Sequence, residues 1–353
     1  MENSRVSRED RVVGCLFGLA FGDALGAPTE FLTVAEILSR WPPAGPADLT
    51  GQPARVTDDT QMTLAVGEAL VDAIVRHDLS PGTVEPLFRS AFVEWLNSPD
   101  NDRAPGMTCL RACEALETGK QWLEATVKSS KGCGANMRVA AVGLLDPGTH
   151  GVSEAERAAV AQFQAALTHG HPTALAASDL TAFTVARLAA GVEPPLLVRL
   201  IRDYAVSQRT VYHANWLGEL WQRSGVESPE EFIARGWEEC VGVLDRLEAA
   251  LSSPDYEADP CLATGEGWVA EEAFATGLLC FLLYPDEPVN ALRRAAVTSG
   301  DSDSIACLTG AFAGAHLGAG RWPQEWMRRI EYRERLVMLA DELSKSTTEA
   351  SPG

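Results

Sequence analysis

Two short acidic segments, far apart in the chain, contain the residue types best suited to metal chemistry. The first is residues 57–60 (TDDT) and the second is residues 300–304 (GDSDS). Carboxylate and hydroxyl oxygens are the ligands that Mg²⁺ and Mn²⁺ prefer. Each segment also has a purely structural interpretation, because a hydroxyl or an aspartate can cap a helix and complement its dipole. Either segment alone therefore predicts no more than a helix N-terminus.

The two segments together support a stronger hypothesis. If they face each other across one cleft, four carboxylates and two hydroxyls could hold two metal ions about 3.5 to 4 Å apart. Without metal ions, the same four aspartates would repel one another. Residues 300–304 also resemble half of a calcium-binding loop, but the downstream glycine and glutamate of that loop are absent. The calcium interpretation is therefore set aside.

The elements that must position these segments are helices. Helical periodicity dominates the chain, alanine is abundant, and no strongly alternating strand pattern extends beyond a few residues. We predict one compact all-α domain over residues 1–345, with long surface loops near residues 42–46 and 252–267. The polar residues 346–353 are predicted to be a disordered tail.

Several helix boundaries and one helix contact can be predicted. Gly14, Gly18 and Gly22 fall on one helix face and would let another backbone come close. A helix from about residue 302 is also rich in small residues. Further helices are expected from about 269 to 285 and from about 323 to 343. Capping residues are expected at Ser7, at Thr57, at Ser153 with Glu156, and at Ser228 with Glu231.

Composition limits the partners of this chain. The formal net charge of −20 repels nucleic acids and anionic membranes, so we expect no stable nucleic-acid binding and no membrane partner. The N-terminal segment lacks an apolar signal core, and the longest apolar candidate, residues 273–284, is too short to cross a bilayer. The eight cysteines form no CxxC pair, which favours reduced thiols and a cytoplasmic protein. We expect a monomer.

Six motifs, in order along the chain, resemble those of the ADP-ribosylglycohydrolase family, and the similarity extends from about residue 10 to residue 340. Residues 57–60 and 299–306 (SGDSDSIA) resemble its two metal motifs. The other four are residues 22–30 (GDALGAPTE), 131–140 (KGCGANMRVA), 168–169 (TH) and 265–273 (GEGWVAEEA).

The resemblance implies a compact, all-helical, orthogonal bundle and an enzyme that cleaves the bond between ADP-ribose and an acceptor. It implies two Mg²⁺ ions, with Mn²⁺ as a substitute, and ADP-ribose as a product. The substrate class that it favours is a protein ADP-ribosylated on arginine. The metal ligands carried over from the family are Thr57, Asp58, Asp59, Asp301, Asp303 and Ser304.

The same resemblance assigns catalytic and substrate-binding roles. Asp303 is the first candidate for a ligand that also acts as the base, and Glu30, near the acceptor side, is the second. The substrate-binding candidates are Gly132, Gly134, Ala135, Asn136, Met137 and His169. Without the motif, the glycine-rich segment would be a plain loop-to-helix turn and the histidine a packing residue. Arg138 is expected to support the fold.

Three positions depart from the family pattern. Ser302 and Ser304 stand where threonine is usual, and both keep a hydroxyl. Cys133 stands where asparagine is usual, so an amide side chain near the expected substrate is replaced by a thiol. All carboxylates expected as ligands are present.

Two other classes of function stay open at this stage. One is a binding or structural member of the family that keeps the pocket without turnover. Another is a two-metal hydrolase of a different phosphate ester or nucleotide. Within the enzyme class, serine-linked and nucleic-acid-linked ADP-ribose are alternatives to arginine.

Overall fold

The computed structural model describes residues 6–345, which fold into helices joined by loops, with four isolated bridges and no extended strand among them. This confirms the all-α prediction. The first half of the chain forms α1 (Arg8–Gly26), α2 (Val34–Arg40), α3 (Asp58–Val75), α4 (Pro81–Leu96), α5 (Met107–Glu117), α6 (Trp122–Ala125), α7 (Ala140–Gly143), α8 (Pro147–His150), α9 (Glu154–Ala166) and α10 (Pro172–Ala189).

The second half continues with α11 (Pro194–Gln208), α12 (Ala214–Leu217), α13 (Pro229–Ser252), α14 (Cys261–Thr264), α15 (Ala270–Leu283), α16 (Pro288–Ala295), α17 (Ser302–Leu317), α18 (Gln324–Arg329) and α19 (Arg333–Ser344). Four short 3₁₀ helices are η1 (Ala27–Thr29), η2 (Cys133–Ala135), η3 (Leu220–Ser224) and η4 (Ala319–Arg321). The tail predicted for residues 346–353 lies outside the described residues.

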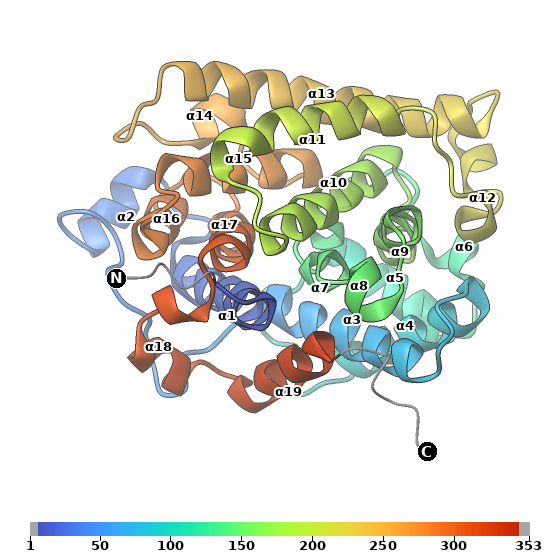
Figure 1. Ribbon diagram of the computed structural model, residues 1–353, viewed down its shortest axis with the longest axis horizontal. Helices are drawn as coiled ribbons and strands as arrows, with labels where there is room; N and C mark the ends of the chain where they lie inside the picture. The colour runs from blue at the N-terminus through green and yellow to red at the C-terminus, as the bar shows by residue number, and fades with distance from the viewer. Residues whose placement is uncertain (1–5, 346–353) are drawn as a thin grey trace.

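Helices α1 and α17 form an antiparallel pair inside the bundle, and Figure 1 shows them side by side. Their backbones come so close that a Cβ atom added to Gly22 would lie 1.9 Å from the carbonyl oxygen of Ala306. A Cβ on Gly18 would lie 2.3 Å from the carbonyl oxygen of Gly310. The predicted close approach at the glycine face is therefore confirmed. It places the C-terminal end of α1 beside the N-terminal end of α17.

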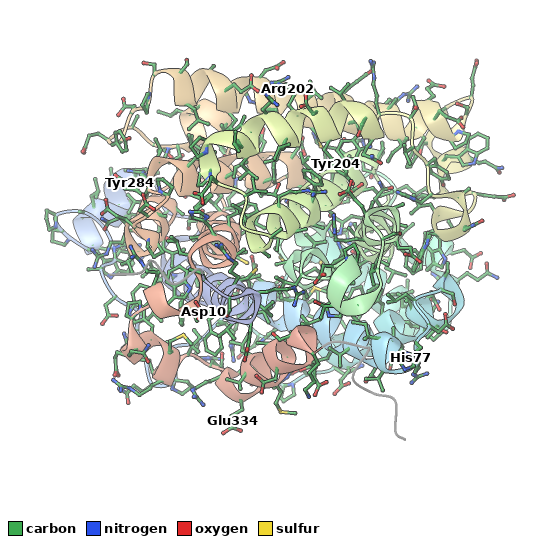
Figure 2. All side chains as sticks on the ribbon, viewed as in Figure 1. Asp10, His77, Arg202, Tyr204, Tyr284 and Glu334 are labelled. Carbon is green, nitrogen blue, oxygen red and sulfur yellow. The ribbon has the colours of Figure 1, made fainter. Side chains whose placement is uncertain are left out.

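The remaining helices surround this pair. Helix α17 also packs on α15 and α16, and α10 packs on α9 and α13. Figure 1 shows α11 and α13 along one edge of the molecule and α18 and α19 along the opposite edge. Helix α11 illustrates the amphipathic pattern in Figure 2, where the buried Tyr204 points inward and Arg202 lies on the outer side near α13.

The capping predictions are confirmed with one exception. Ser7 and Ser153 accept hydrogen bonds from backbone N–H groups in the first turns of α1 and α9, and Glu156 completes the reciprocal box. Ser228 accepts from the N–H of Glu231 at 3.1 Å. The side chain of Glu231, however, accepts from the N–H of Glu227, so the second half of that predicted box is not formed.

The prediction of a single helix over residues 323–343 is wrong. The chain breaks between α18 and α19, where Ala54 donates to the carbonyl of Arg329 at 2.8 Å and accepts from the N–H of Glu331 at 2.9 Å. This pairing removes two backbone groups from a helical ladder, and Tyr332 adopts a left-handed φ of 54°. A long-range backbone contact therefore overrides a local helical pattern.

The expectation about the longest apolar stretch is also corrected. Residues Arg8–Thr29 are long and apolar enough to cross a bilayer when only length and composition are considered. In the structure, 83% of the apolar window of this helix is buried inside the molecule. Its apolar character is thus explained by its place in the core against α17.

Candidate active site

The two acidic segments meet at one cleft. Asp58 and Asp59 occupy the first turn of α3, whereas Asp301 is the N-cap of α17 and Asp303 follows in its first turn. The cleft has a volume of about 320 Å³. The predicted residues that line it are Glu30, Asp58, Asp59, Gly132, Gly134, Met137, His169, Asp301, Asp303 and Ser304. The expectation that both acidic segments share one cleft is therefore confirmed.

Asp23 fixes the position of the first acidic segment, although sequence analysis gave it no role. This fully buried side chain accepts hydrogen bonds from the backbone N–H groups of Thr57 and Thr60 at 2.9 and 3.0 Å. It also accepts from their hydroxyls at 2.9 and 2.5 Å. The end of α1 therefore holds the N-terminus of α3. The Thr57 hydroxyl is directed to Asp23, and this predicted metal ligand is not among the residues that line the cleft.

Glu30 joins the second acidic segment from the loop after η1. Ligand oxygens of Glu30, Asp301 and Asp303 lie within 4.8 Å of one another, an arrangement that could hold a metal ion. Glu30 also lines a neighbouring cavity of about 560 Å³ that shares Phe31 and Ala104 with the acidic cleft. It therefore lies at the boundary between two connected spaces.

The glycine-rich segment is held against the start of α15. The N–H of Cys133 donates to the carbonyl of Trp268 at 3.1 Å, and the N–H of Ala270 donates to the carbonyl of Lys131 at 2.8 Å. Next to this pairing, the N–H of Asp301 donates to the carbonyl of Glu266 at 2.8 Å. One stretch of chain thus positions both the glycine-rich segment and α17.

Two of the predicted substrate-binding residues are not among those that line the cleft. Ala135 is fully buried, and its carbonyl accepts from Gln164 and Ser178. Asn136 is also fully buried and donates to the carbonyl of Ala270 at 3.0 Å. Both residues support the wall of the cleft from behind.

His169 and Arg138 differ in their relation to the cleft. His169 lines it, and its Nδ1 lies 2.8 Å from the hydroxyl of Thr168. Burial lowers the pKa of His169, which favours the neutral imidazole. Arg138 is fully buried, donates to Gln164 and Thr168, and stacks over the ring of Phe92. The expectation that Arg138 supports the fold agrees with these contacts.

Burial and repulsion by neighbouring carboxylates raise the pKa values of four carboxyl groups in the cleft: Glu30, Asp58, Asp59 and Asp301. Burial and the charge of Asp303 raise the pKa of Asp58 to about 7, and the same two causes raise the pKa of Glu30 to about 9. Burial, followed by the charge of Asp303, raises the pKa values of Asp59 and Asp301 well above the ordinary range. A cation in the cleft would reverse this penalty.

The donor set fits a hard divalent cation. Asp59 is buried and its Oδ1 atom has no hydrogen-bond partner, which is costly for a carboxylate oxygen. Within residues 6–345, the ion pairs of lysine and arginine involve none of Asp58, Asp59, Asp301 or Asp303. Carboxylate and hydroxyl oxygens without a basic side chain are suited to a metal ion.

An aromatic pair stands at the mouth of the cleft. Phe31 and Trp268 stack with ring centroids 5.5 Å apart, and both line the cleft. Phe31 is 68% exposed and adopts a left-handed φ of 63°, an unfavourable conformation for a bulky residue. Its backbone strain and exposure indicate a position set by the cleft and not by core packing. No local pattern in the sequence predicted this feature.

Comparisons with known proteins identify the family. Residues 4–353 match the ADP-ribosylglycohydrolase family. The chain belongs to this family. It is 25% identical over 332 residues to ADP-ribosyl-[dinitrogen reductase] glycohydrolase of Rhodospirillum rubrum, with 93% of this chain and 92% of that protein covered.

Two further relatives cover almost all of this chain. ADP-ribosylarginine hydrolase Tri1 of Serratia proteamaculans is 27% identical, with 95% of this chain and 79% of that protein covered. ADP-ribosylhydrolase ARH3 of Mus musculus is 26% identical, with 97% and 93% covered. A solved structure named as an ADP-ribosylglycohydrolase-related protein complex has the same fold, with a TM-score of 0.64, 23% identity, and 96% of this chain and 98% of that chain covered. The chain is therefore an ADP-ribosylglycohydrolase enzyme with the fold that was predicted.

The two serine departures from the family pattern have separate positions in this ADP-ribosylglycohydrolase. Ser304 lines the cleft and keeps a hydroxyl available there. Ser302 instead accepts from the Thr29 hydroxyl at 2.9 Å and donates to the carbonyl of Gly26 at 3.2 Å. It therefore joins α17 to the end of α1 and lies outside the cleft.

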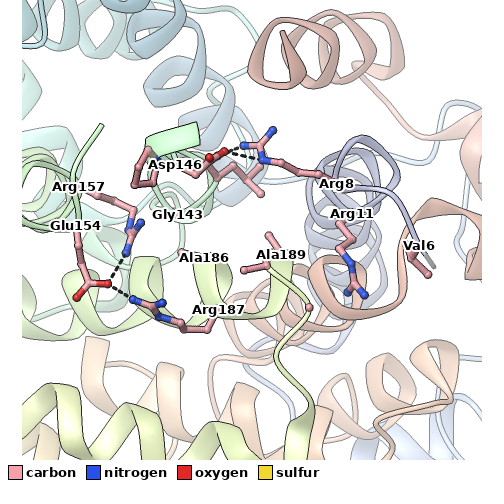
Figure 3. Close-up of a pocket in the computed structure, with 14 residues that line it drawn as sticks. Val6, Arg8, Arg11, Gly143, Asp146, Glu154, Arg157, Ala186, Arg187 and Ala189 are labelled. Atoms are coloured by element: carbon pink, nitrogen blue, oxygen red, sulfur yellow. Dashed lines mark hydrogen bonds and ion pairs between the residues drawn. The ribbon is translucent and has the colours of Figure 1, made fainter. Parts of the chain in front are cut away.

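A further cavity of this ADP-ribosylglycohydrolase, of about 520 Å³, lies elsewhere and shares no lining residue with the acidic cleft. Figure 3 shows Arg8 paired with Asp146 there, and Glu154 lying between Arg157 and Arg187. Arg8 also donates to the carbonyls of Leu144 and Leu343. These guanidinium groups connect helix ends, so the cavity is a structural junction and not a second acidic centre.

Proposed function

We propose that this enzyme releases ADP-ribose from arginine side chains of modified proteins and that it requires divalent metal ions, with Mg²⁺ first and Mn²⁺ as a substitute. The observation that carries the proposal is the meeting of the α3 and α17 aspartates around one cleft, where Asp59 Oδ1 has no partner. Asp58 and Asp59 would hold metal from one side, and Asp301, Asp303 and Ser304 from the other.

The reaction adds one water molecule across a glycosidic bond. The bond between the anomeric carbon of the distal ribose and the acceptor nitrogen breaks, and a bond between that carbon and the water oxygen forms. One proton of the water stays on the new hydroxyl group, and the other passes to the acceptor nitrogen. When bound, the cations would supply Lewis-acid activation of the water and of the ribose hydroxyls.

The side chains of this chain have separate tasks in that reaction. Asp303 would accept the proton from the attacking water, because it lies on the cleft beside Asp301 and Glu30. Glu30 would contact the acceptor, because it also lines the neighbouring cavity. Gly132, Gly134, Met137 and His169 would form the wall against ADP-ribose.

Two considerations support arginine as the acceptor. The relatives include proteins named as an ADP-ribosylarginine hydrolase and an ADP-ribosyl-[dinitrogen reductase] glycohydrolase. In addition, an acidic cleft in a chain of net charge −20 attracts a cationic guanidinium group. A cytoplasmic location and a monomeric state stay predictions from the sequence.

The test measures ADP-ribose release from a protein ADP-ribosylated on arginine, with Mg²⁺ and with a chelator. We expect release by the natural protein only with Mg²⁺, and a loss of at least about 100-fold in Asp303→Ala, since general acid–base catalysis alone contributes on the order of 10² to 10⁴. The matched control is Asp203→Ala on the outer part of α11, where the side chain is 69% exposed.

The same assay with serine-linked and nucleic-acid-linked ADP-ribose separates the acceptor classes. Faster release from one of these substrates than from arginine would overturn the arginine assignment. ADP-ribose binding measured by calorimetry, together with no release from any of the three substrates, would instead indicate a binding protein. Release that persists in the chelator would overturn the metal requirement.

A further inference from the structure

A thiol lies inside the acidic cleft of this enzyme. Cys133 Sγ donates to Asp301 Oδ2 at 2.7 Å, and the hydroxyl of Ser304 lies 3.6 Å from the same sulfur. The backbone of Cys133 is fixed at the start of η2 by its hydrogen bond to Trp268. The sulfur is therefore held beside two of the residues proposed as metal ligands.

A second observation at the same place indicates a missing ligand. Asp59, only 2% exposed, lines the cleft together with Cys133 and Asp301, and its Oδ1 atom has no hydrogen-bond partner. A buried carboxylate oxygen without a partner is costly unless a cation occupies the space before it. The thiol on the glycine-rich segment and this oxygen on the first acidic segment thus belong to one donor set.

Cys133, which is half-buried, differs in this respect from two buried cysteines near the cleft. The Cys109 sulfur also lines the cleft, but it accepts a hydrogen bond from the guanidinium of Arg138 at 3.6 Å. The Cys307 sulfur donates to the backbone carbonyl of Met137 at 3.6 Å. Cys307 also interacts with Asp59, but it does not line the cleft. Of these three sulfurs, Cys133 is therefore the one that both lines the cleft and donates to a predicted metal ligand there.

We propose that Cys133 supplies a sulfur ligand to the metal centre, so that this enzyme binds thiophilic divalent cations such as Zn²⁺, Co²⁺ and Cd²⁺ more tightly than Mg²⁺. The inference rests on the metal site of the proposed function and adds a donor to it. Thiolate sulfur favours borderline and soft cations, whereas an all-oxygen site suits Mg²⁺ and Mn²⁺. When such a cation binds, the S–H bond breaks, a bond from sulfur to the metal forms, and the proton passes to the solvent.

The first measurement is the absorption spectrum of the full chain, treated with chelator, dialysed, and titrated with Co²⁺. A cobalt–thiolate bond gives a charge-transfer band in the near ultraviolet that oxygen ligands do not give. We expect this band in the natural protein and its loss in Cys133→Ser. The matched control is Cys15→Ser, because Cys15 is buried in the first half of α1 and does not line the cleft.

The second measurement compares Zn²⁺ and Mg²⁺ affinities by competition in the same proteins. We expect the preference for Zn²⁺ to fall at least about 10-fold in Cys133→Ser, because metal selectivity follows the donor atoms. Cys133→Asn provides a second variant with an oxygen donor at this position, in case the serine variant does not fold. Its spectrum should also lack the band.

Three outcomes would overturn the inference: Co²⁺ binding without a charge-transfer band, a band of equal strength in both Cys133 variants, or an unchanged Zn²⁺ preference. Each would mean that the thiol only donates a hydrogen bond to Asp301. The result is independent of turnover. A protein that shows the band but releases no ADP-ribose would contradict the proposed function and support the sulfur ligand. A protein that releases ADP-ribose without showing the band would support the proposed function and contradict the sulfur ligand.

Discussion

At the scale of single residues, two buried aspartates, one behind the cleft and one lining it, have opposite surroundings. Asp23 accepts hydrogen bonds from the backbone and side chains of Thr57 and Thr60, whereas Asp59 Oδ1 has no partner. Sequence analysis predicted Asp59 because it stands in a short acidic segment. It did not predict the structural role of Asp23, because the donors Thr57 and Thr60 lie 34 and 37 residues further along the chain. Asp23 therefore maintains the site, and Asp59 is available to a ligand.

This difference predicts an unusual effect of Asp59→Asn. In the chelated protein, the variant should unfold at a higher temperature than the natural protein, because it removes one of several buried charges that repel one another. With Mg²⁺ at 100 times its dissociation constant, the natural protein should gain about 2.7 kcal/mol of stability. The variant should gain far less. Thermal unfolding with chelator and with Mg²⁺ measures both effects.

The control for this prediction is Asp203→Asn, which changes an exposed aspartate on α11 by the same chemistry. It should leave both the metal-free stability and the Mg²⁺ gain unchanged. A lower stability of Asp59→Asn in chelator would mean that the Asp59 carboxylate stabilises the metal-free fold, contrary to our interpretation.

The motif match also illustrates what sequence cannot resolve at this scale. Gly134 and Asn136 belong to the same glycine-rich segment, yet only Gly134 lines the cleft. Asn136 is turned to the carbonyl of Ala270. Which face of a short turn meets the substrate depends on its pairing with residues 268–270, a contact between segments more than 100 residues apart.

At the scale of elements, the α1–α17 pair determines where the second acidic segment lies. The four-residue spacing of glycines predicted a close helix contact, but not which helix would form it. The contact with α17 depends on matching small residues, since a Cβ on Gly310 would lie 1.8 Å from the carbonyl oxygen of Gly18. The break between α18 and α19 could not be predicted, because it depends on the backbone pairing of Ala54.

Gly22→Ala should therefore damage the site through the helix pair. The added methyl group would lie 1.9 Å from the carbonyl oxygen of Ala306, so the two helices must separate. We expect the free energy of unfolding to fall by about 1 to 3 kcal/mol, the usual cost of overpacking. We also expect weaker Mg²⁺ binding, because Asp303 moves with α17. Urea unfolding and calorimetry measure these two quantities.

Gly242→Ala in α13 is the matched control. Gly242 lies inside α13, and a Cβ atom added to it would meet no atom within 4 Å. This change should raise the free energy of unfolding by about 0.5 to 1 kcal/mol, since alanine is the better helix former. If both substitutions had the same small effect, close packing of α1 on α17 would not be what positions the second acidic segment.

At the scale of the whole molecule, the charge distribution presents a problem for the substrate. ADP-ribose carries a diphosphate, and the chain has a net charge of −20. The first turns of α3 and α17 lie at the cleft, and helix N-termini favour anions. Metal ions among the carboxylates would add positive charge at the same place. The net charge can be read from the composition, but the convergence of two helix N-termini required the three-dimensional fold.

A buried charge outside the cleft provides a prediction for the whole fold. Asp179 in α10 is 1% exposed and accepts hydrogen bonds from Tyr204 of α11 at 2.7 Å and from Gln162 of α9 at 2.9 Å. Burial raises its pKa to about 6, from an ordinary value of 3.8. The folded state therefore binds this proton more tightly than the unfolded state does, and three helices meet at the group that carries it.

The consequence is a loss of stability as the pH rises from about 4 to about 6. Because the folded pKa is the higher one, the contribution of Asp179 is most favourable below the unfolded pKa and is lost as the pH passes the folded pKa. A pKa difference of 6 − 3.8 = 2.2 corresponds to on the order of 3 kcal/mol. Asp179→Asn is neutral at every pH and should not show this loss.

The measurement is the free energy of unfolding of both proteins between pH 4 and pH 8, with chelator present. Titration of the cleft carboxylates is common to both proteins, so the difference between them isolates Asp179. As the pH rises from about 4 to about 6, the natural protein should lose on the order of 3 kcal/mol of unfolding free energy relative to Asp179→Asn. Above about pH 6 the difference between the two proteins should stay constant. A constant offset at all pH values would mean only a changed hydrogen bond to Gln162 or Tyr204. Asp179 would then have a similar proton affinity in the folded and unfolded chains.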